Sequence, residues 1–146
     1  MISGMIVSKL SKFNSNECSV LHGLKRSEKD FSGFGEVYFS TIKFGKIKGW
    51  RSHSKMTMNL IVPRGKVHFV FYDDREDSST FNEYYQVITS SLENYSRITV
   101  PPLVWMSFKG LDKEPSIVAN VASIEHSLEE VKRRELKEFK FDWSKN

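Results

Sequence analysis

From Gly35 onward the sequence alternates short apolar–polar runs with turn residues. We predict eight strands from this pattern, over residues 36–44, 47–53, 56–62, 66–72, 83–89, 96–100, 103–108 and 116–123. Glycine- and proline-containing turns separate several of them, at residues 44–46, 63–65 and 109–112. Strands at this regular spacing, without helical patterns between them, predict an all-β sandwich or barrel rather than alternating βαβ units.

The two ends of the chain are patterned differently from this central region. Residues 1–34 form a weakly patterned lead-in, in which the segment 5–10 could add a strand to a neighbour. Residues 124–146 are expected to form a C-terminal tail or a short helix over 127–139, because Ser127 and Glu130 have the spacing of a capping box. We therefore expect a single domain over residues 1–146, with its barrel core at 35–123.

The composition indicates an ordinary globular chain that is rich in strand-forming aromatics. Hydrophobic residues make up 39% and charged residues 27%, and there are 11 Phe, 5 Tyr and 3 Trp. The net charge is +4, but lysines and arginines are interleaved with acids, and even the dense run at 132–140 contains two glutamates. This favours a solvated face over a nucleic-acid patch.

The cysteine content and the lengths of the apolar runs indicate the compartment in which the protein works. The single Cys18 cannot form an internal disulfide, so the fold requires no oxidising compartment. The apolar runs are far shorter than the roughly 20 residues that a membrane-spanning helix needs, and the start of the chain lacks a clear apolar core with a cleavage site. We therefore expect a cytoplasmic protein with no membrane partner.

Alternation within the segment 66–73 assigns one face of a strand to the core. Val67, Phe69 and Phe71 share that face. The opposite face, which carries His68 and Tyr72, is predicted to line either a cavity or solvent, and periodicity does not decide between them.

Three stretches carry a more specific pattern. They read GWRSHSKMT at residues 49–57, FYDDREDS at 71–78 and ITVPPLVWMSFKGL at 98–111. Together, over about residues 35–123, the chain resembles the cupin superfamily, and more narrowly the dTDP-4-dehydrorhamnose 3,5-epimerase-like proteins of surface polysaccharide pathways. The resemblance implies a jelly-roll barrel of about eight or more short antiparallel strands, whose ligand-binding residues converge on the barrel mouth.

The resemblance also bears on metal binding. Metal-binding cupins place their ligands at the positions that Arg51, His53, Thr57 and Met106 occupy in this sequence. One good ligand of four cannot hold zinc, iron or nickel, because such sites need about three protein side chains with N, O or S donors. We expect no metal and no other cofactor, and the epimerase-like branch is known for working without metal.

In this branch the chemistry is removal of a proton from the carbon next to a sugar ketone. It needs a base, a group that stabilises the enolate oxygen and an acid that returns a proton. His53 matches the family's base position, although a half-buried histidine that hydrogen-bonds a loop is the alternative. Arg51 is expected to hold a pyrophosphate or polarise the keto oxygen, unless it is a surface arginine at a strand edge.

The sequence departs from the family pattern at several places. Met106 replaces a histidine, Leu103 replaces a glycine, and the segment 117–122 lacks the tyrosine that serves the 3,5-epimerases as acid. Double epimerisation is therefore not expected. Tyr38 and Tyr72 are the candidates for a substitute acid and for substrate binding, unless they are core or rim aromatics.

Trp105 is a further candidate for substrate binding, because an indole can stack on a nucleotide base or a sugar. Filling the barrel is the alternative task for such a large ring.

Two functions remain open. One is a metal-free epimerase or isomerase of a nucleotide-linked 4-keto-6-deoxysugar, and the other is a non-catalytic module that binds a sugar nucleotide or a partner protein. The resemblance and an open sheet edge imply a homodimer. No nucleic-acid partner is expected.

Overall fold

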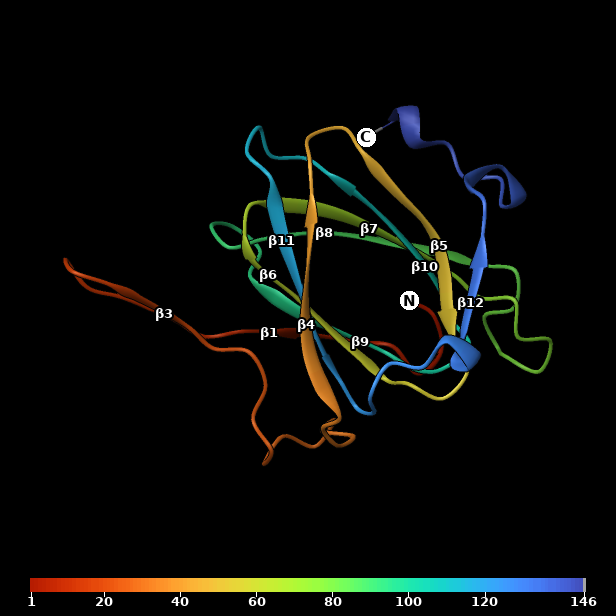
Figure 1. Cartoon of the computed structure of the whole chain (residues 1–146), viewed down its shortest axis with the longest axis horizontal. Coiled ribbons are helices and arrows are strands. Elements are labelled where there is room, and N and C mark those ends of the chain that lie inside the picture. Colours follow the sequence, from red (N-terminus) through yellow and green to blue (C-terminus); the bar gives the residue numbers. More distant parts are fainter. Residues whose placement is uncertain (146) are drawn as a thin grey trace.

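The computed structural model describes residues 1–145, which form two five-stranded antiparallel sheets that face each other (Figure 1). The first sheet has the order β1 (Ile6–Lys9), β9 (Ser96–Val100), β6 (Met58–Arg64), β11 (Ser116–Ala122) and β4 (Glu36–Ile42). The second has the order β12 (Val131–Arg134), β5 (Ile47–His53), β10 (Trp105–Gly110), β7 (Lys66–Tyr72) and β8 (Tyr84–Ser90). The predicted all-β jelly-roll barrel is confirmed.

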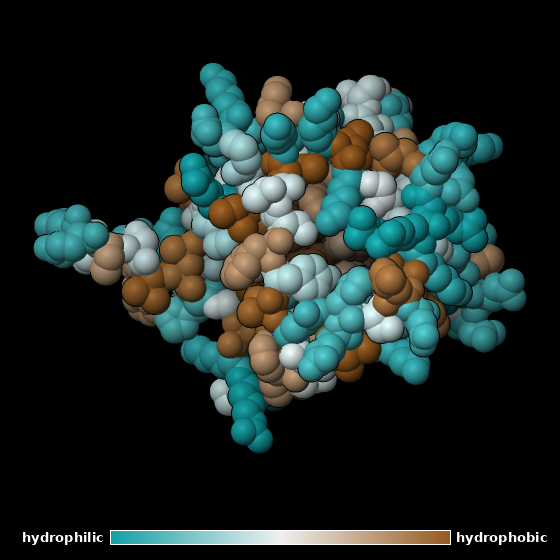
Figure 2. Space-filling model, viewed as in Figure 1, coloured by the Kyte–Doolittle hydropathy of each residue, from teal (hydrophilic) through white to brown (hydrophobic). Residues whose placement is uncertain are grey.

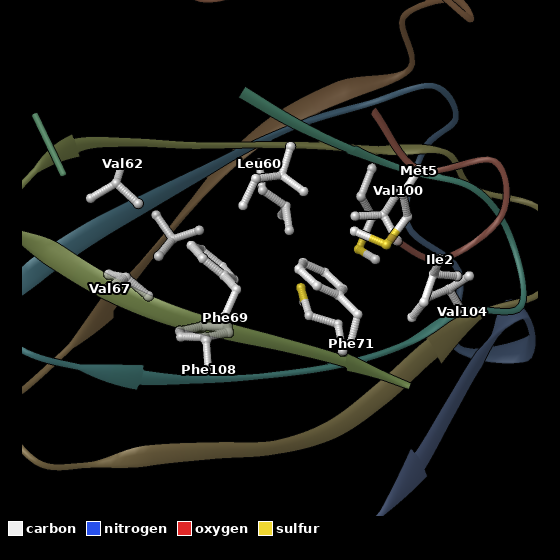
Figure 3. Close-up of a cluster of buried hydrophobic side chains, with 14 of the residues drawn as sticks. Ile2, Met5, Leu60, Val62, Val67, Phe69, Phe71, Val100, Val104 and Phe108 are labelled. Atoms are coloured by element: carbon white, nitrogen blue, oxygen red, sulfur yellow. The ribbon is translucent and has the colours of Figure 1, made fainter. Parts of the chain in front are cut away.

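All eight predicted strands are present within a few residues of their expected bounds, as β4 to β11. The core lies between the two sheets (Figure 3) and contains Val67, Phe69 and Phe71, as the alternation predicted. The lead-in also contributes, because Ile2 and Met5 are buried in this core and β1 pairs with β9. A small hairpin of β2 (Lys12–Asn14) and β3 (Ser19–Leu21) projects away from the barrel (Figure 1).

The other face of β7 differs from both alternatives that the sequence left open. His68 and Val70 are buried, yet they face neither the cavity between the sheets nor solvent. They lie on the outer face of the second sheet, beneath aromatic residues of the C-terminal segment such as Phe141 and Trp143. A third possibility, a sheet face covered by the end of the chain, therefore applies.

Of the two expectations for residues 124–146, a tail or a short helix over 127–139, the helix does not form. Ser127 does cap a turn, since its hydroxyl accepts a hydrogen bond from the Glu129 amide at 3.3 Å, but the turn is a short 3-10 helix, η1 (Leu128–Glu130). Strand β12 follows and pairs with β5, and two further 3-10 turns, η2 (Leu136–Glu138) and η3 (Trp143–Lys145), complete the segment. Pairing with an open sheet edge overrides the local helical signal. Within residues 1–145 no helix has the length and apolar character needed to cross a membrane.

The FYDDREDS stretch forms a hydrogen-bonded loop after β7. The buried carboxylate of Asp73 accepts hydrogen bonds from the Arg75 guanidinium at 2.7 and 2.8 Å and from the hydroxyls of Ser78 and Thr80 at 2.6 and 2.7 Å. Burial alone raises the pKa of Asp73, but these hydrogen bonds outweigh it and hold the pKa well below its usual range. Arg75 also donates to the Ser3 carbonyl at 2.8 Å, so the loop fastens the N-terminus. The motif is thus structural.

Candidate active site

A cavity of about 440 Å³ opens between the two sheets, where the edge strand β4 lies opposite β5 and β12. Its walls come from β4, β5, β6, β10 and β11 and from the segment 126–131. Figure 2 views the molecule from the side of β4 and β5 and shows this face hollowed near its centre. The cavity is large enough for a small ligand, because ligand pockets are typically about 300–1,000 Å³ in volume.

His53 and Glu130 form a buried pair in the cavity wall. His53 ends β5, and its Nδ1 hydrogen-bonds the Glu130 carboxylate, with side chains that are 5% and 6% exposed. The second Glu130 oxygen accepts the backbone N–H groups of Lys55 and Met56, both at 3.3 Å. Burial raises the pKa of Glu130, but the hydrogen bonds from His53 and the two amides outweigh it, so the pKa is lowered and the carboxylate is ionised at neutral pH.

This pairing fixes the protonation pattern of the imidazole. An ionised carboxylate only accepts hydrogen bonds, so Nδ1 of His53 must carry a proton toward Glu130. The proton on Nδ1 leaves Nε2 of the neutral ring as the basic nitrogen. A histidine held in one tautomer by a carboxylate is suited to act as a general base.

Cationic side chains line the same cavity. Lys48 and Arg51 project into it from β5, and Arg133 on β12 is the register partner of Arg51. Burial and the neighbouring charge of Arg133 lower the pKa of Arg51, while burial and then the charges of Arg51 and Arg133 lower the pKa of Lys48. Among residues 1–145, none of the ion pairs involves these three cations. The cluster therefore favours binding of an anion.

A β-bulge explains how Lys48 reaches the cavity. Arg51 pairs with Met106 of β10, but Lys48 pairs with Phe108, so β5 carries one residue more than β10 in this interval. Strict alternation from Arg51 would place Lys48 on the outer face, with Trp50. The bulge instead returns Lys48 to the inner face, where its ammonium donates to the Ser40 hydroxyl at 3.2 Å and lies 5.5 Å from the centre of the Phe108 ring.

Tyr38 lines the opposite wall, on β4. The Asn120 amide nitrogen donates to the Tyr38 hydroxyl at 2.9 Å, and the Asn120 amide oxygen accepts from the Asn59 N–H at 3.0 Å. This second bond fixes which end of the amide faces Tyr38. Burial, assisted by the charges of Glu36 and Glu130, raises the pKa of Tyr38. Because its oxygen accepts a hydrogen bond, the phenol keeps its own proton available for donation.

Glu36 and His126 also line the cavity, and most of the remaining wall is apolar. Methionine, leucine, phenylalanine and valine side chains from three strands form it, namely Met58, Leu60, Met106, Phe108 and Val118. Met106 thus occupies the position where the family pattern has histidine, and it adds apolar surface instead of a polar contact.

The structure brings together three of the five site residues that the sequence predicted. His53, Arg51 and Tyr38 line the cavity, whereas Tyr72 and Trp105 lie outside it, on the outer face of the second sheet. The Tyr72 hydroxyl donates to the Asn82 side chain at 2.8 Å, and the Trp105 indole N–H donates to Asp74 at 2.7 Å.

Leu103 also departs from the family pattern in a way that the backbone explains. Its φ is 69°, in the left-handed region where glycine is favoured. Its N–H donates to the His53 carbonyl at 2.7 Å, so this strained residue helps to hold the strand end that carries the candidate base.

Sequence reasoning missed several residues of the site, among them His126, which lines the cavity with its ring centre 6.5 Å from that of His53. Glu130 was interpreted as part of a helix cap, and Lys48 falls on the wrong face under strict alternation. The signal that could have found Glu130 is the alternation of Phe139, Phe141 and Trp143 downstream, which is typical of an extended segment packed on a sheet.

The donor set does not fit a resident metal ion. Of the four positions considered, Arg51, His53 and Met106 lie at the cavity, while the Thr57 N–H donates to the Ser123 hydroxyl at 2.9 Å. Throughout residues 1–145 no group of three or more His, Cys, Asp or Glu side chains is arranged to hold a metal. The cavity holds two imidazoles, His53 and His126, and His53 is already bonded to Glu130, so these two fall short of the three protein donors that such sites use.

Comparison with known proteins gives a consistent result, although no family model matches the chain. A solved structure of a dTDP sugar isomerase from Desulfovibrio desulfuricans G20 superimposes with a TM-score of 0.94 at 35% identity, covering 98% of this chain and 92% of that one. A dTDP-4-dehydrorhamnose 3,5-epimerase from Bacillus anthracis, solved with TDP and pyrophosphate bound, gives a TM-score of 0.84 at 19% identity, covering 97% of this chain and 85% of that one, and supports the fold.

Two curated proteins are also similar. The probable low-salt glycan biosynthesis epimerase Agl13 of Haloferax volcanii is 31% identical over 84 residues, which is 57% of this chain and 53% of that protein. The chain therefore spans about half the length of that relative. The spore coat polysaccharide biosynthesis protein SpsL of Bacillus subtilis is 29% identical over 115 residues, covering 79% of this chain and 76% of that protein. The 35% identity that extends over nearly all of both chains, together with the shared jelly roll, shows that the chain belongs to the dTDP-4-dehydrorhamnose 3,5-epimerase-like family of the cupin superfamily.

Proposed function

We propose that the protein is an epimerase or isomerase that moves a proton next to the ketone of a nucleotide-linked 4-keto-6-deoxysugar, in a pathway of surface polysaccharide synthesis. The observation that carries the proposal is the buried His53–Glu130 pair at a cavity lined by Lys48 and Arg51, which form no ion pair within residues 1–145. Family membership supports the reaction class, and the proposed chemistry uses no metal.

His53 is the base in this proposal. Its Nε2 removes the proton from the carbon next to the ketone, and the electron pair moves into an enolate oxygen. The positive charge that develops on the imidazole is stabilised by the ionised Glu130 carboxylate. Glu130 itself keeps its charge throughout, because its lowered pKa disfavours protonation.

Two further groups complete the reaction. Arg51 or Lys48 stabilises the enolate oxygen or the diphosphate, since both carry positive charge into the cavity. Tyr38 donates its phenolic proton to the carbon of the enolate, and solvent reprotonates the phenolate; its raised pKa keeps the phenol protonated at neutral pH, and Asn120 holds its oxygen in place. Tyr38 thereby replaces, from the neighbouring strand, the tyrosine that the family carries on the strand of Asn120.

Conversion of dTDP-4-keto-6-deoxyglucose, followed by proton NMR, tests the proposal. We expect the wild-type protein to convert the substrate, and His53→Asn and Tyr38→Phe to reduce conversion by about a hundredfold or more each. Tyr72→Phe is the matched control, because Tyr72 lies outside the cavity. Binding of thymidine diphosphate without conversion would favour the alternative, a non-catalytic sugar-nucleotide module, and loss of activity in the control alone would contradict the assignment of the site.

We further propose that the protein works as a cytoplasmic homodimer. Strand β4 is an open edge of its sheet, and it exposes Val37 and Phe39 on its outer side. The projecting β2–β3 hairpin also exposes Phe13 and Val20, which find no cover within residues 1–145. A second copy would cover such surface. Sedimentation equilibrium should show a dimer that Phe39→Asp weakens; a monomer at all concentrations would contradict this.

A further inference from the structure

Three aromatic residues near the C-terminus cover the outer face of the second sheet. We call Phe139, Phe141 and Trp143 the aromatic clasp. The Phe141 and Trp143 rings lie 6.2 and 5.5 Å from the ring of His68 on β7, and the Trp143 carbonyl accepts a hydrogen bond from Lys109 of β10 at 3.0 Å. The clasp therefore crosses strands of the sheet on the side opposite the cavity.

Phe139 makes the most extensive contacts of the three. Its ring centre lies 5.2 Å from that of Trp50, 4.6 Å from that of Tyr72 and 5.3 Å from that of Trp105. These partners come from β5, β7 and β10, so one side chain links the C-terminal segment to three strands. The Arg134 guanidinium lies 5.5 Å from the Phe139 ring. Such aromatic pairs add stabilisation beyond that of their area burial.

Strand β12 connects this clasp to the active site. It is a four-residue edge strand that pairs with β5 alone, and its residues 132–134 are exposed. Val131, which is half-buried and lines the cavity, is its one apolar contribution. An edge strand that buries so little is not held firmly by its own side chains. The apolar anchor closest to it in sequence and inserted among large side chains is Phe139.

Glu130 immediately precedes β12, and its burial carries a desolvation cost. An ionised carboxylate loses hydration on burial, and hydrogen bonds from His53 and two backbone amides offset that loss for Glu130. Seating of β12 on β5 supports these bonds, because Val131 is the register partner of His53, and the Glu130 carbonyl also accepts a hydrogen bond from the Ser54 N–H at 2.8 Å. Release of the strand would return Glu130 to water and free the imidazole from its carboxylate.

We infer that Phe139 is a positioning residue for the active site: by anchoring β12 from the outer face of the sheet, it holds Glu130 against His53 in the cavity. Its catalytic consequence rests on the proposed function, whereas the positioning itself does not. The hydrogen bond between His53 and Glu130 on the cavity face of the sheet therefore depends on the packing of Phe139 on the outer face.

The test compares Phe139→Ala with Phe139→Leu and with Leu136→Ala. Leu136 belongs to the same segment but lies at the surface, so it controls for a generic effect of truncating a C-terminal side chain. Three quantities are measured on the full chain: the low-field proton signal and ring-nitrogen shifts of His53, amide hydrogen exchange of β12 against that of β7, and kcat with KM.

For Phe139→Ala we expect the low-field His53 signal to weaken or vanish and β12 amides to exchange at least about tenfold faster, with β7 amides unchanged. We expect kcat to fall at least about tenfold with KM changed less than about threefold, because misplacement affects the reacting groups more than binding. Phe139→Leu should show the same changes to a smaller extent, because leucine keeps part of the apolar anchor, and Leu136→Ala should resemble the wild type.

Two results would overturn the inference: an unchanged His53 signal with unchanged β12 exchange in a folded Phe139→Ala protein, or equal effects in Leu136→Ala. If Phe139→Ala does not fold, Phe139→Leu carries the same comparison with a partial effect, and its identity with the wild type in every measurement would overturn the inference. An inactive wild type would refute the proposed function, yet the NMR and exchange measurements would still decide the positioning.

Discussion

Replacement of Glu130 by glutamine removes a charge while nearly preserving shape. The side-chain oxygen of glutamine can still accept the Lys55 and Met56 amides, so we expect the fold to remain and the free energy of unfolding to fall by no more than about 1–3 kcal/mol. What is lost is the attraction between a carboxylate and the imidazolium that forms on His53 in the proposed reaction, together with the acceptor that keeps the proton on Nδ1.

The size of that loss follows from Coulomb's law. Two unit charges about 4 Å apart attract by about 4 kcal/mol at an effective dielectric constant of about 20, which suits a partly solvated site. Because the imidazolium exists only as the proton is transferred, the loss affects the transition state and not the bound substrate. At about 1.4 kcal/mol for each factor of ten, kcat should fall about a thousandfold, with little change in KM.

Steady-state kinetics on the keto-sugar substrate, with thermal unfolding measured in parallel, provides the assay. Glu129→Gln is the matched control, because Glu129 is the exposed neighbour of Glu130 and its replacement by glutamine removes the same charge from the chain. A Glu130→Gln enzyme within about threefold of wild-type kcat would refute the role of the carboxylate. An equal loss in Glu129→Gln would attribute the effect to net charge.

Three other predictions follow from single contacts. Asp73→Asn should lower the free energy of unfolding, measured in urea, by about 3–5 kcal/mol, because it leaves the half-buried Arg75 without its carboxylate. Because the folded-state pKa of Asp73 is lowered, its stabilisation is present above about pH 4 and is lost as the pH falls further. A wild-type stability that is independent of pH below 4 would contradict this. Leu103→Gly should raise the unfolding midpoint, since relief of a left-handed leucine is worth about 1–2 kcal/mol against about 0.5–1 kcal/mol of added chain entropy; a lower midpoint would argue against strain. Lys48→Met should weaken thymidine diphosphate binding in calorimetry by about tenfold, with the bulged strand intact, and unchanged affinity would exclude Lys48 from the anion site.

The barrel could be predicted from the sequence because its central strands obey one rule. Apolar residues at every second position mark the face that packs in the core, as Phe69 and Phe71 do on β7, and glycine marks tight turns between strands. At Gly65, for example, φ is +86° and an added Cβ would lie 2.3 Å from the Ser116 hydroxyl oxygen. Local chemistry of this kind needs no knowledge of the rest of the chain.

The C-terminal segment could not be predicted in the same way, because its structure depends on a partner distant in sequence. Ser127 and Glu130 have a helical spacing, and that local preference is weak compared with pairing to β5 and packing of Phe139 among the aromatic side chains. The same long-range pairing brings Glu130 to His53, 77 residues away, so half of the candidate catalytic pair was invisible to local patterns.

The remaining site residues show where alternation succeeds and where it fails. Arg51 and His53, two residues apart on a regular strand end, do point into the cavity together. Lys48 joins them only because of the bulge. Trp105 was a reasonable candidate from its aromatic character, but residues on a sheet have two faces, and alternation alone does not state which face encloses the cavity.

The most direct test of the whole account is the deuterium content of the sugar ring after incubation with the protein in heavy water. Exchange detects abstraction of the proton even when no net product accumulates. If His53 is the base, a dTDP-linked 4-keto-6-deoxysugar should acquire deuterium next to its ketone with the wild-type protein, and at the buffer rate with His53→Asn. Equal incorporation with both proteins, or none above buffer with the wild type, would contradict the account.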